Sequence, residues 1–260
     1  HGVIPASWSL DHVGALTRTV EDTALVLEAM AGYDPQDPTA LNEPTPRYLE
    51  DLAQSLKGRV VGVPTSFFEP QEEAVAQALQ AALVVLQELG LQVVPVDLPA
   101  CLPESLAAHV LVMQTEAAAY HQERFLAAPE KFGPHLRQQL ALGSLTPAVD
   151  YLQAQRVRHV FKVEFMKLFA EVDVIVTPTT STVAPAELAN TGDPAFNGPF
   201  TNIGLPALTV PIGFEAKRNL PIGMQLASAP DREALVLAIG HQYQLATAWH
   251  GARPQLDPVE

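Results

Sequence analysis

Ser9, Asp11 and His12 lie close together in the sequence and are the residue types of a serine-hydrolase triad. A triad needs a serine raised on a strained turn, a base within reach of its hydroxyl, and backbone N–H groups that hold the oxyanion. The segment from Pro5 to Asp11 supplies no such turn. We therefore expect Asp11 to cap the following segment and His12 to lie at the surface.

Other recognisable catalytic and binding motifs are missing. The fifteen glycines include no Gly-Gly pair, no Gly-x-Gly and no Gly-x-Ser-x-Gly, which excludes phosphate-cradling loops and a hydrolase elbow. The eight histidines are dispersed, so the sequence does not support a histidine metal site. Cys101 lies in a predicted loop without a nearby cation, which favours an inert, half-buried thiol. We expect neither a cofactor nor a metal.

Two arginines fall on a predicted helix. Arg156 and Arg158 are followed in the next turns by Lys162 and Glu164, and one interpretation is a solvated helix face with i, i+4 charge pairing. The alternative makes Arg158 a pocket cation that binds the carboxyl or carbonyl group of a substrate. The sequence leaves both interpretations open.

A long predicted loop at 179–206 is rich in Pro, Thr and Asn. Loops of this length are more often functional than idle. Its second half contains Phe196, Asn197, Phe200, Thr201 and Asn202, which combine aromatic faces with amide and hydroxyl donors beside a strand. This composition is typical of a substrate-binding wall and equally of a well-packed loop.

Short β-type runs alternate with longer helical patterns, and these elements must position the polar residues above. Strands are predicted at 59–64, 92–96, 173–178 and 207–212, where β-branched runs are bounded by Pro, Gly or Asp, and a fifth at 222–226 closes an edge. Apolar periodicity predicts helices at 20–31, 72–89, 103–126, 147–171 and 231–247, the first of them capped by Thr19. The pattern indicates α/β layers in one compact unit.

Composition narrows the classes of function. The chain has 260 residues, 48% of them hydrophobic, which is enough to bury roughly 70% of the unfolded surface in a core. A net charge of −14 argues against nucleic acid or an anionic membrane as a direct partner. No apolar run is long enough to span a membrane, and a single cysteine fits a reducing, cytoplasmic location.

Three stretches carry motifs in a fixed order. They are residues 7–22 (SWSLDHVGALTRTVED) running on to 31–37 (AGYDPQD), residues 165–179 (FMKLFAEVDVIVTPT), and residues 204–214 (GLPALTVPIGF) followed by 220–226 (LPIGMQL). In this order and spacing they resemble the C-terminal half of the amidase signature family, which includes the glutamyl-tRNA amidotransferase A subunits. The tail, with Trp249-His250 and Arg253-Pro254, is similar to that of plain amidases. The resemblance implies the C-terminal part of an amidase domain over residues 1–260, with a mixed β-sheet core covered by helices.

The resemblance also implies where the catalytic groups lie. The family hydrolyses carboxamides with a serine nucleophile, a second serine preceded by a cis peptide, and a lysine base that is held neutral. These groups belong to a Gly/Ser-rich signature that precedes a Ser-Leu-Asp segment like residues 9–11, and residues 1–8 alone precede it here. We therefore assign no catalytic residue within this chain. Its lysines do not match the base, because none stands upstream of a Gly/Ser-rich stretch: Lys57, Lys131, Lys162, Lys167 and Lys217.

Part of the substrate side matches the family. In glutamine-using relatives, an arginine at the position that resembles Arg158 holds the substrate carboxylate, and an acidic residue before the Gly-Leu-Pro strand binds its amino group. That second position falls near Pro194 and Ala195, with Asp193 adjacent, and this departure favours a general amide over glutamine. The predicted contacts to a small-molecule amide are Arg158, Phe196, Asn197, Phe200, Thr201 and Asn202.

Three hypotheses follow. The preferred one is the C-terminal portion of an amidase-signature hydrolase, inactive alone, whose partner is the N-terminal half of the same fold. The second is a noncatalytic remnant that binds a small molecule or a protein. The third, a hydrolase that uses its own Ser9, needs an oxyanion loop that the sequence lacks. If strands are missing, an open sheet edge and an apolar face predict low stability or homo-oligomerisation.

Overall fold

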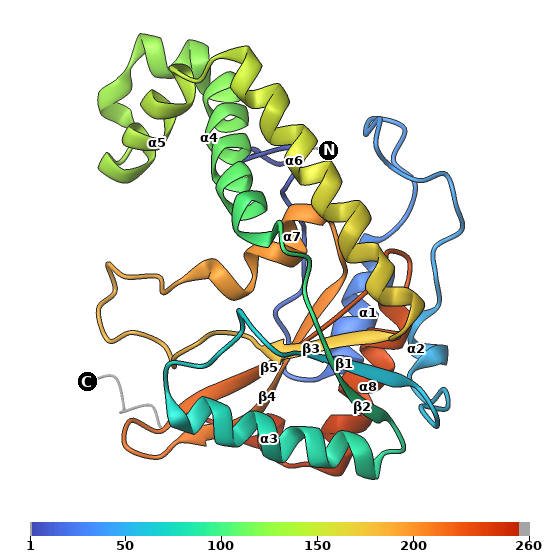
Figure 1. Cartoon of the computed structure of the whole chain (residues 1–260). Helices are drawn as coiled ribbons and strands as arrows, with labels where there is room; N and C mark the ends of the chain where they lie inside the picture. Colours follow the sequence, from blue (N-terminus) through green and yellow to red (C-terminus); the bar gives the residue numbers. More distant parts are fainter. Residues whose placement is uncertain (1, 255–260) are drawn as a thin grey trace, which may run out of the picture.

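A five-stranded sheet forms the centre of the computed structural model, which describes residues 2–254 (Figure 1). The strand order is β2-β1-β3-β5-β4. β1 is parallel to β2 and β3, whereas β5 is antiparallel to both β3 and β4. The predicted α/β class with a mixed sheet is confirmed. Residues 1 and 255–260 of the expected 1–260 unit lie outside the described residues.

The strands are β1 (Val60–Pro64), β2 (Gln92–Val96), β3 (Val174–Pro178), β4 (Ala207–Glu215) and β5 (Leu220–Ser228). The first three agree with the prediction to within one residue, while β4 and β5 are longer because they pair as a hairpin. The prediction that 222–226 closes an edge was wrong, since β5 lies between β3 and β4. Its alternating pattern does not mark a solvated edge, because Gly223 lies beneath two threonines and the buried Gln225 amide donates to Thr177 and to the Phe196 carbonyl oxygen.

The α-helices are α1 (Val20–Met30), α2 (Tyr48–Asp51), α3 (Glu73–Glu88), α4 (Leu102–Ala127), α5 (Pro134–Ser144), α6 (Ala148–Met166), α7 (Gly198–Ile203) and α8 (Glu233–Ala246). Short 3₁₀ turns follow at η1 (Pro129–Lys131), η2 (Lys167–Ala170), η3 (Pro194–Phe196) and η4 (Trp249–Gly251). The prediction missed α2 and α5, continued the helix of α6 through η2, and described 179–206 as one loop, although η3 and α7 lie inside it. α7 has only six residues and ends at Gly204 in the left-handed conformation, with φ of 71°.

Helices cover both faces of the sheet (Figure 1). Val174 and Val176 of β3 belong to a core that they share with α3 and α8. Ile175 points the other way and packs in a second core with Phe165 of α6 and Phe200 of α7. Every residue of β3 is buried, because successive side chains of this central strand enter opposite cores.

The helices α4, α5 and α6 form a group that extends away from the sheet, with α5 at its far end (Figure 1). α4 contacts both α5 and α6. Gly143 of α5 makes the closest approach, because a Cβ built there would lie 1.9 Å from the carbonyl oxygen of Gln114 on α4. Only glycine lets the two helix backbones meet at this distance.

The N-terminal segment runs from α4 and α6 down to α1 on the opposite side of the sheet (Figure 1). The Thr19 hydroxyl accepts the Asp22 backbone N–H at 3.0 Å, which confirms the predicted cap of α1. The backbone N–H of Val20 donates to the Gln244 side chain of α8 at 2.8 Å. Both ends of the segment are therefore attached to helices of the core.

Within residues 2–254, β4 pairs with β5 alone, and Ala207 and Thr209 on it are exposed. The sheet edges at β2 and β4 are thus open to pairing in the described part of the chain. None of the helices described combines the length and the apolar character that crossing a bilayer requires.

We expect Gly143→Ala to lower the free energy of unfolding by about 2 kcal/mol, because overpacking outweighs the gain of about 1 kcal/mol in helix propensity. Urea denaturation measures the change. The control is Gly14→Ala, where a Cβ meets nothing within 4 Å and the change should stay near zero. Equal stability of both variants would show that α4 and α5 do not pack this closely.

Candidate functional site

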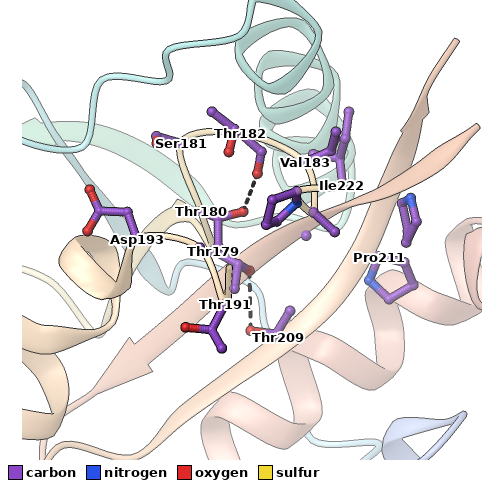
Figure 2. Close-up of a pocket in the computed structure, with 15 residues that line it drawn as sticks. Thr179, Thr180, Ser181, Thr182, Val183, Thr191, Asp193, Thr209, Pro211 and Ile222 are labelled. Atoms are coloured by element: carbon purple, nitrogen blue, oxygen red, sulfur yellow. Dashed lines mark hydrogen bonds between the residues drawn. The ribbon is translucent and has the colours of Figure 1, made fainter. Parts of the chain in front are cut away.

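A pocket of about 410 Å³ opens where the chain leaves β3 (Figure 2). Its walls come from residues 179–185 and 191–193 and from the hairpin β4–β5. Six hydroxyl side chains line it: Thr179, Thr180, Ser181, Thr182, Thr191 and Thr209. Prolines and aliphatic side chains such as Val183 and Ile222 supply the apolar remainder. A pocket with this mixture suits a small, polar and uncharged ligand.

A hydroxyl pair crosses the floor of the pocket. Thr179 follows β3 and Thr209 lies on β4, and their Oγ1 atoms are 3.2 Å apart (Figure 2). The strand between them, β5, carries Gly223 at this point. A Cβ there would lie 2.7 Å from Thr179 Oγ1 and 2.9 Å from Thr209 Cγ2. Gly223 therefore leaves room for the side chains of Thr179 and Thr209 to meet over β5.

Asp193 is the one charged side chain among the described residues that line the pocket, and neither His, Lys nor Arg lines it. Its carboxylate accepts the Ala195 backbone N–H at 2.9 Å and so caps η3. Ser181 also lines the pocket, but no basic side chain in the lining is placed to activate its hydroxyl. The pocket can bind a ligand, whereas its own residues supply no nucleophile with a base.

The segment 193–202 connects this pocket with Arg158. Phe196 and Phe200 pack against Phe68, with ring centroids 5.1 Å and 5.7 Å apart respectively. The Phe196 carbonyl oxygen accepts a hydrogen bond of 3.1 Å from the buried Gln225 amide of β5. The rings of Phe196 and Phe200 thus lie in the core between the sheet and helices α6 and α7, and neither ring lines the pocket.

The other predicted wall residues lie on α7 or at its start. Asn197 is the half-buried N-cap of α7, and Thr201 is half-buried in it. Asn202 is fully buried and its amide donates to the Ser105 hydroxyl of α4 at 2.5 Å. Because none of the six predicted residues lines the pocket, their contact with a substrate stays a prediction.

Arg158 is half-buried on α6. Its Nη2 donates to the Ser9 carbonyl oxygen at 2.6 Å and its Nη1 to Ser9 Oγ at 3.0 Å, while Nε donates to the Asn202 carbonyl oxygen. The interpretation as a solvated helix face was therefore wrong for Arg158. Arg156 is exposed, and Glu164 pairs not at i, i+4 but with Lys167 three positions later, at 2.6 Å. Burial lowers the pKa of Arg158, opposed by the nearby charge of Glu116.

Glu116 of α4, which sequence reasoning missed, lies beside this arginine and is 2% exposed. Its carboxylate accepts from the hydroxyls of Ser7 at 2.5 Å, Ser9 at 2.7 Å and Tyr151 at 2.8 Å, and from the Ser9 backbone N–H at 3.1 Å. Burial alone raises the pKa of Glu116, but the hydrogen bonds from Ser7 and Ser9 outweigh it and hold that pKa below its usual 4.5.

Comparison with known proteins identifies the family of this chain. The family model described as "Amidase" matches residues 1–237. The chain belongs to the amidase signature family. An amidase from Pseudomonas putida is 38% identical over 273 residues, a match that covers 98% of this chain and 57% of that protein. The A subunit of a glutamyl-tRNA(Gln) amidotransferase from Picosynechococcus sp. is 36% identical over 294 residues, a match that covers 98% of this chain and 59% of that protein.

The solved structures agree. This chain superimposes on one described as a vestigial protein complex that reveals the evolutionary origins of an s-triazine catabolic enzyme, with a TM-score of 0.83 and 29% identity. That match covers 94% of this chain and 55% of the other. The chain thus spans 57% and 59% of the two curated relatives above, consistent with a C-terminal portion of the amidase fold.

In this amidase-family chain, Ser9, Asp11 and His12 do not form a triad. Asp11 accepts the backbone N–H groups of Ala6 and Ser7 at 2.8 Å and 3.1 Å, so it caps the preceding turn and not the following segment as expected. His12 is exposed, as predicted, and its Nδ1 lies 2.7 Å from the Leu10 carbonyl oxygen. The backbone turns here, with the Leu10 and Asp11 N–H groups donating to the Ser7 carbonyl oxygen, and this turn places the N–H groups of Ala6 and Ser7 beside the Asp11 carboxylate.

Ser9 does meet a proton acceptor, Glu116, at 2.7 Å. A carboxylate whose pKa is below its ordinary value is a weak base at neutral pH, and the Ser9 hydroxyl also accepts a hydrogen bond from Arg158. Ser9 is absent from the pocket lining. These contacts favour a structural clamp over an activated nucleophile.

We expect Gly223→Ala to break the Thr179–Thr209 hydrogen bond and to lower the free energy of unfolding by about 1–2 kcal/mol. Thermal melts and a crystal structure of the variant check this. Gly251→Ala is the control, since a Cβ meets nothing within 4 Å there. An unchanged threonine pair in the variant would contradict the account of the pocket floor.

The lowered pKa of Glu116 predicts a pH dependence of stability. The contribution of Glu116 is present above the ordinary carboxyl pKa and is lost as the pH falls through the lowered one, since protonation removes an acceptor. We expect Glu116→Gln to cost about 2 kcal/mol at pH 7, with a difference from wild type that shrinks below about pH 4. Urea denaturation across pH measures it. Glu123→Gln, an exposed position of the same helix, should show no such difference.

Proposed function

We propose that this chain forms the substrate-binding part of an amidase that hydrolyses the C–N bond of small carboxamides. The serine nucleophile, the second serine and the lysine base then come from the Gly/Ser-rich part of the amidase fold. The observation that carries the proposal is membership of the amidase family together with a pocket lined by hydroxyl groups and by no His, Lys or Arg side chain.

The chemistry of the pocket supports an uncharged amide. Threonine hydroxyls both donate and accept hydrogen bonds, so they match the carbonyl oxygen and the N–H groups of a carboxamide. No Arg, Lys or His side chain in the lining is placed to bind a carboxylate. A general amide is therefore favoured over glutamine.

Arg158 has two N–H groups left for a substrate, one on each terminal nitrogen. In the proposed enzyme these groups polarise or orient the amide carbonyl. Within residues 196–202 the half-buried Asn197 and Thr201 form the wall beside them, and the buried Phe196, Phe200 and Asn202 support that wall from the core. The open edge at β4 supports the N-terminal half of the same fold as the partner of this chain. A noncatalytic remnant that binds a small molecule or a protein is the alternative, and a homo-oligomer covering the edge is compatible with either.

The proposal is tested by ammonia release from benzamide and from glutamine. We expect none from residues 1–260 alone, and release chiefly from benzamide when the chain is joined to the part of the Pseudomonas putida amidase that the match does not cover. Turnover by residues 1–260 that Ser9→Ala abolishes would refute the proposal and favour a hydrolase based on Ser9. A joined protein that binds benzamide without hydrolysing it would favour the remnant.

In the joined, active protein, Arg158→Lys should lower kcat/KM for benzamide about tenfold, because an ammonium group cannot keep the fork of donors that holds Ser9, Asn202 and the amide together. The matched control is Arg156→Lys, an exposed arginine two positions earlier on the same helix. Equal activity of both variants would remove Arg158 from the substrate site.

A further inference from the structure

We propose that Glu116 is a positioning residue for Arg158 and acts on it through Ser9. The proposal deepens the proposed function, since it rests on Arg158 facing the amide. It starts from the fact that α4 supplies a buried carboxylate and α6 a half-buried guanidinium to the same serine.

All the polar groups of Ser9 take part. Its backbone N–H donates to Glu116 at 3.1 Å, and its carbonyl oxygen accepts from Arg158 at 2.6 Å. Its hydroxyl donates to Glu116 at 2.7 Å and accepts from Arg158 at 3.0 Å. The direction of that hydroxyl is fixed, because a carboxylate can only accept and a guanidinium can only donate.

The Ser9 hydroxyl links the Glu116 carboxylate to the Arg158 guanidinium, because it donates to the first and accepts from the second. The ion pairs found among residues 2–254 do not join Glu116 directly to Arg158, so Ser9 is the bridge between them. Tyr151 of α6 donates to the same carboxylate oxygen as Ser9 does. A buried carboxylate that is saturated by such donors strengthens each of them, since charge-assisted hydrogen bonds are about twice as strong as neutral ones.

The other ionisable groups near the bridge are Tyr151 and His109. Burial raises the pKa of Tyr151 and Glu116 raises it further, so the phenol stays protonated and keeps donating. Burial lowers the pKa of His109, and Arg158 lowers it as well, so the imidazole tends to remain neutral. Because the lowered pKa of His109 also falls in the acidic range, a His109→Gln background is used for the pH titrations, and in it the acid-range titration of the bridge is that of Glu116.

The consequence for function is geometric. With Nε bound to the Asn202 carbonyl oxygen and both terminal nitrogens bound to Ser9, the plane of the guanidinium is fixed, and so are its two remaining N–H groups. Loss of the Glu116 charge frees Ser9 and lets that plane rotate. Catalytic groups must be held within a narrow range of geometry, so this rotation is expected to impair amide orientation.

The test follows the Nε–H resonance of Arg158 in ¹H–¹⁵N NMR spectra of residues 1–260, without substrate. In Glu116→Gln we expect this N–H and the Ser9 amide to exchange with solvent about tenfold faster than in wild type, with a shifted Arg158 resonance. In the His109→Gln background the Arg158 resonance should titrate with Glu116 as the pH is lowered, and with Glu116→Gln added it should not. Glu123→Gln is the matched control and should behave as wild type.

Ser9→Ala gives an independent readout if Glu116→Gln fails to fold. It keeps the carboxylate bound by Ser7, Tyr151 and the backbone N–H of residue 9, keeps the residue 9 carbonyl bound to Arg158, and removes only the hydroxyl of the bridge. We expect it to melt cooperatively and to reduce the acid-range titration of the Arg158 resonance. An Arg158 resonance that is unchanged in either folded variant overturns the proposal. Since no substrate is present, that failure is distinct from a failure to hydrolyse amides.

Discussion

The hydrogen-bonded bridge from Glu116 through Ser9 to Arg158 is the interaction on which the arrangement of this chain depends. A carboxylate that is 2% exposed is costly unless donors saturate it, and its donors come from the N-terminal segment and from α6. The same contacts therefore stabilise the charge and attach three segments to one another. Removing one partner leaves a buried charge without compensation, so the bridge is expected to form as a unit.

This bridge and the pocket share a connecting segment. Residues 193–202 begin at Asp193 on the pocket rim, pass through Phe196 and Phe200 in the core, and end at Asn202, whose carbonyl oxygen binds Arg158. The aromatic residues fix this segment by packing on Phe68. Residues 193–202 thus fix the position of the Arg158 guanidinium relative to the pocket, as the proposed substrate-binding role requires.

The sequence allowed the strands and most helices to be predicted because each carries a local signal. The buried run of β3 is short and β-branched, and Thr19 begins α1 as a recognisable cap. The order of the strands followed from no local signal, so β5 was wrongly placed at an edge. A helix as short as α7 leaves too few turns for a periodic pattern, and its residues looked like loop.

The site was only partly predictable for a related reason. Arg158 was recognisable by its resemblance to a family position, but its partner Ser9 is 149 residues away and the pair is set by packing of distant elements. Glu116 left one signal that could have been used. It continues the buried face of α4 through Ser105, Ala108 and Val112, where a carboxylate needs a polar partner. The pocket hydroxyls gave no such signal, because threonines are common in loops. The contact between Thr179 and Thr209 also depends on Gly223 of another strand.

The most direct measurement is a double-mutant cycle on the free energy of unfolding that combines Glu116→Gln with Arg158→Gln, performed with Ser9 intact and again with Ser9→Ala. A bridge through the hydroxyl predicts a coupling energy of about 1–2 kcal/mol with Ser9 intact and a clearly smaller one without it, where only the backbone groups of residue 9 and the direct attraction of the two charges remain. Equal coupling in the two backgrounds would contradict the account, because the two charges would then interact without the serine.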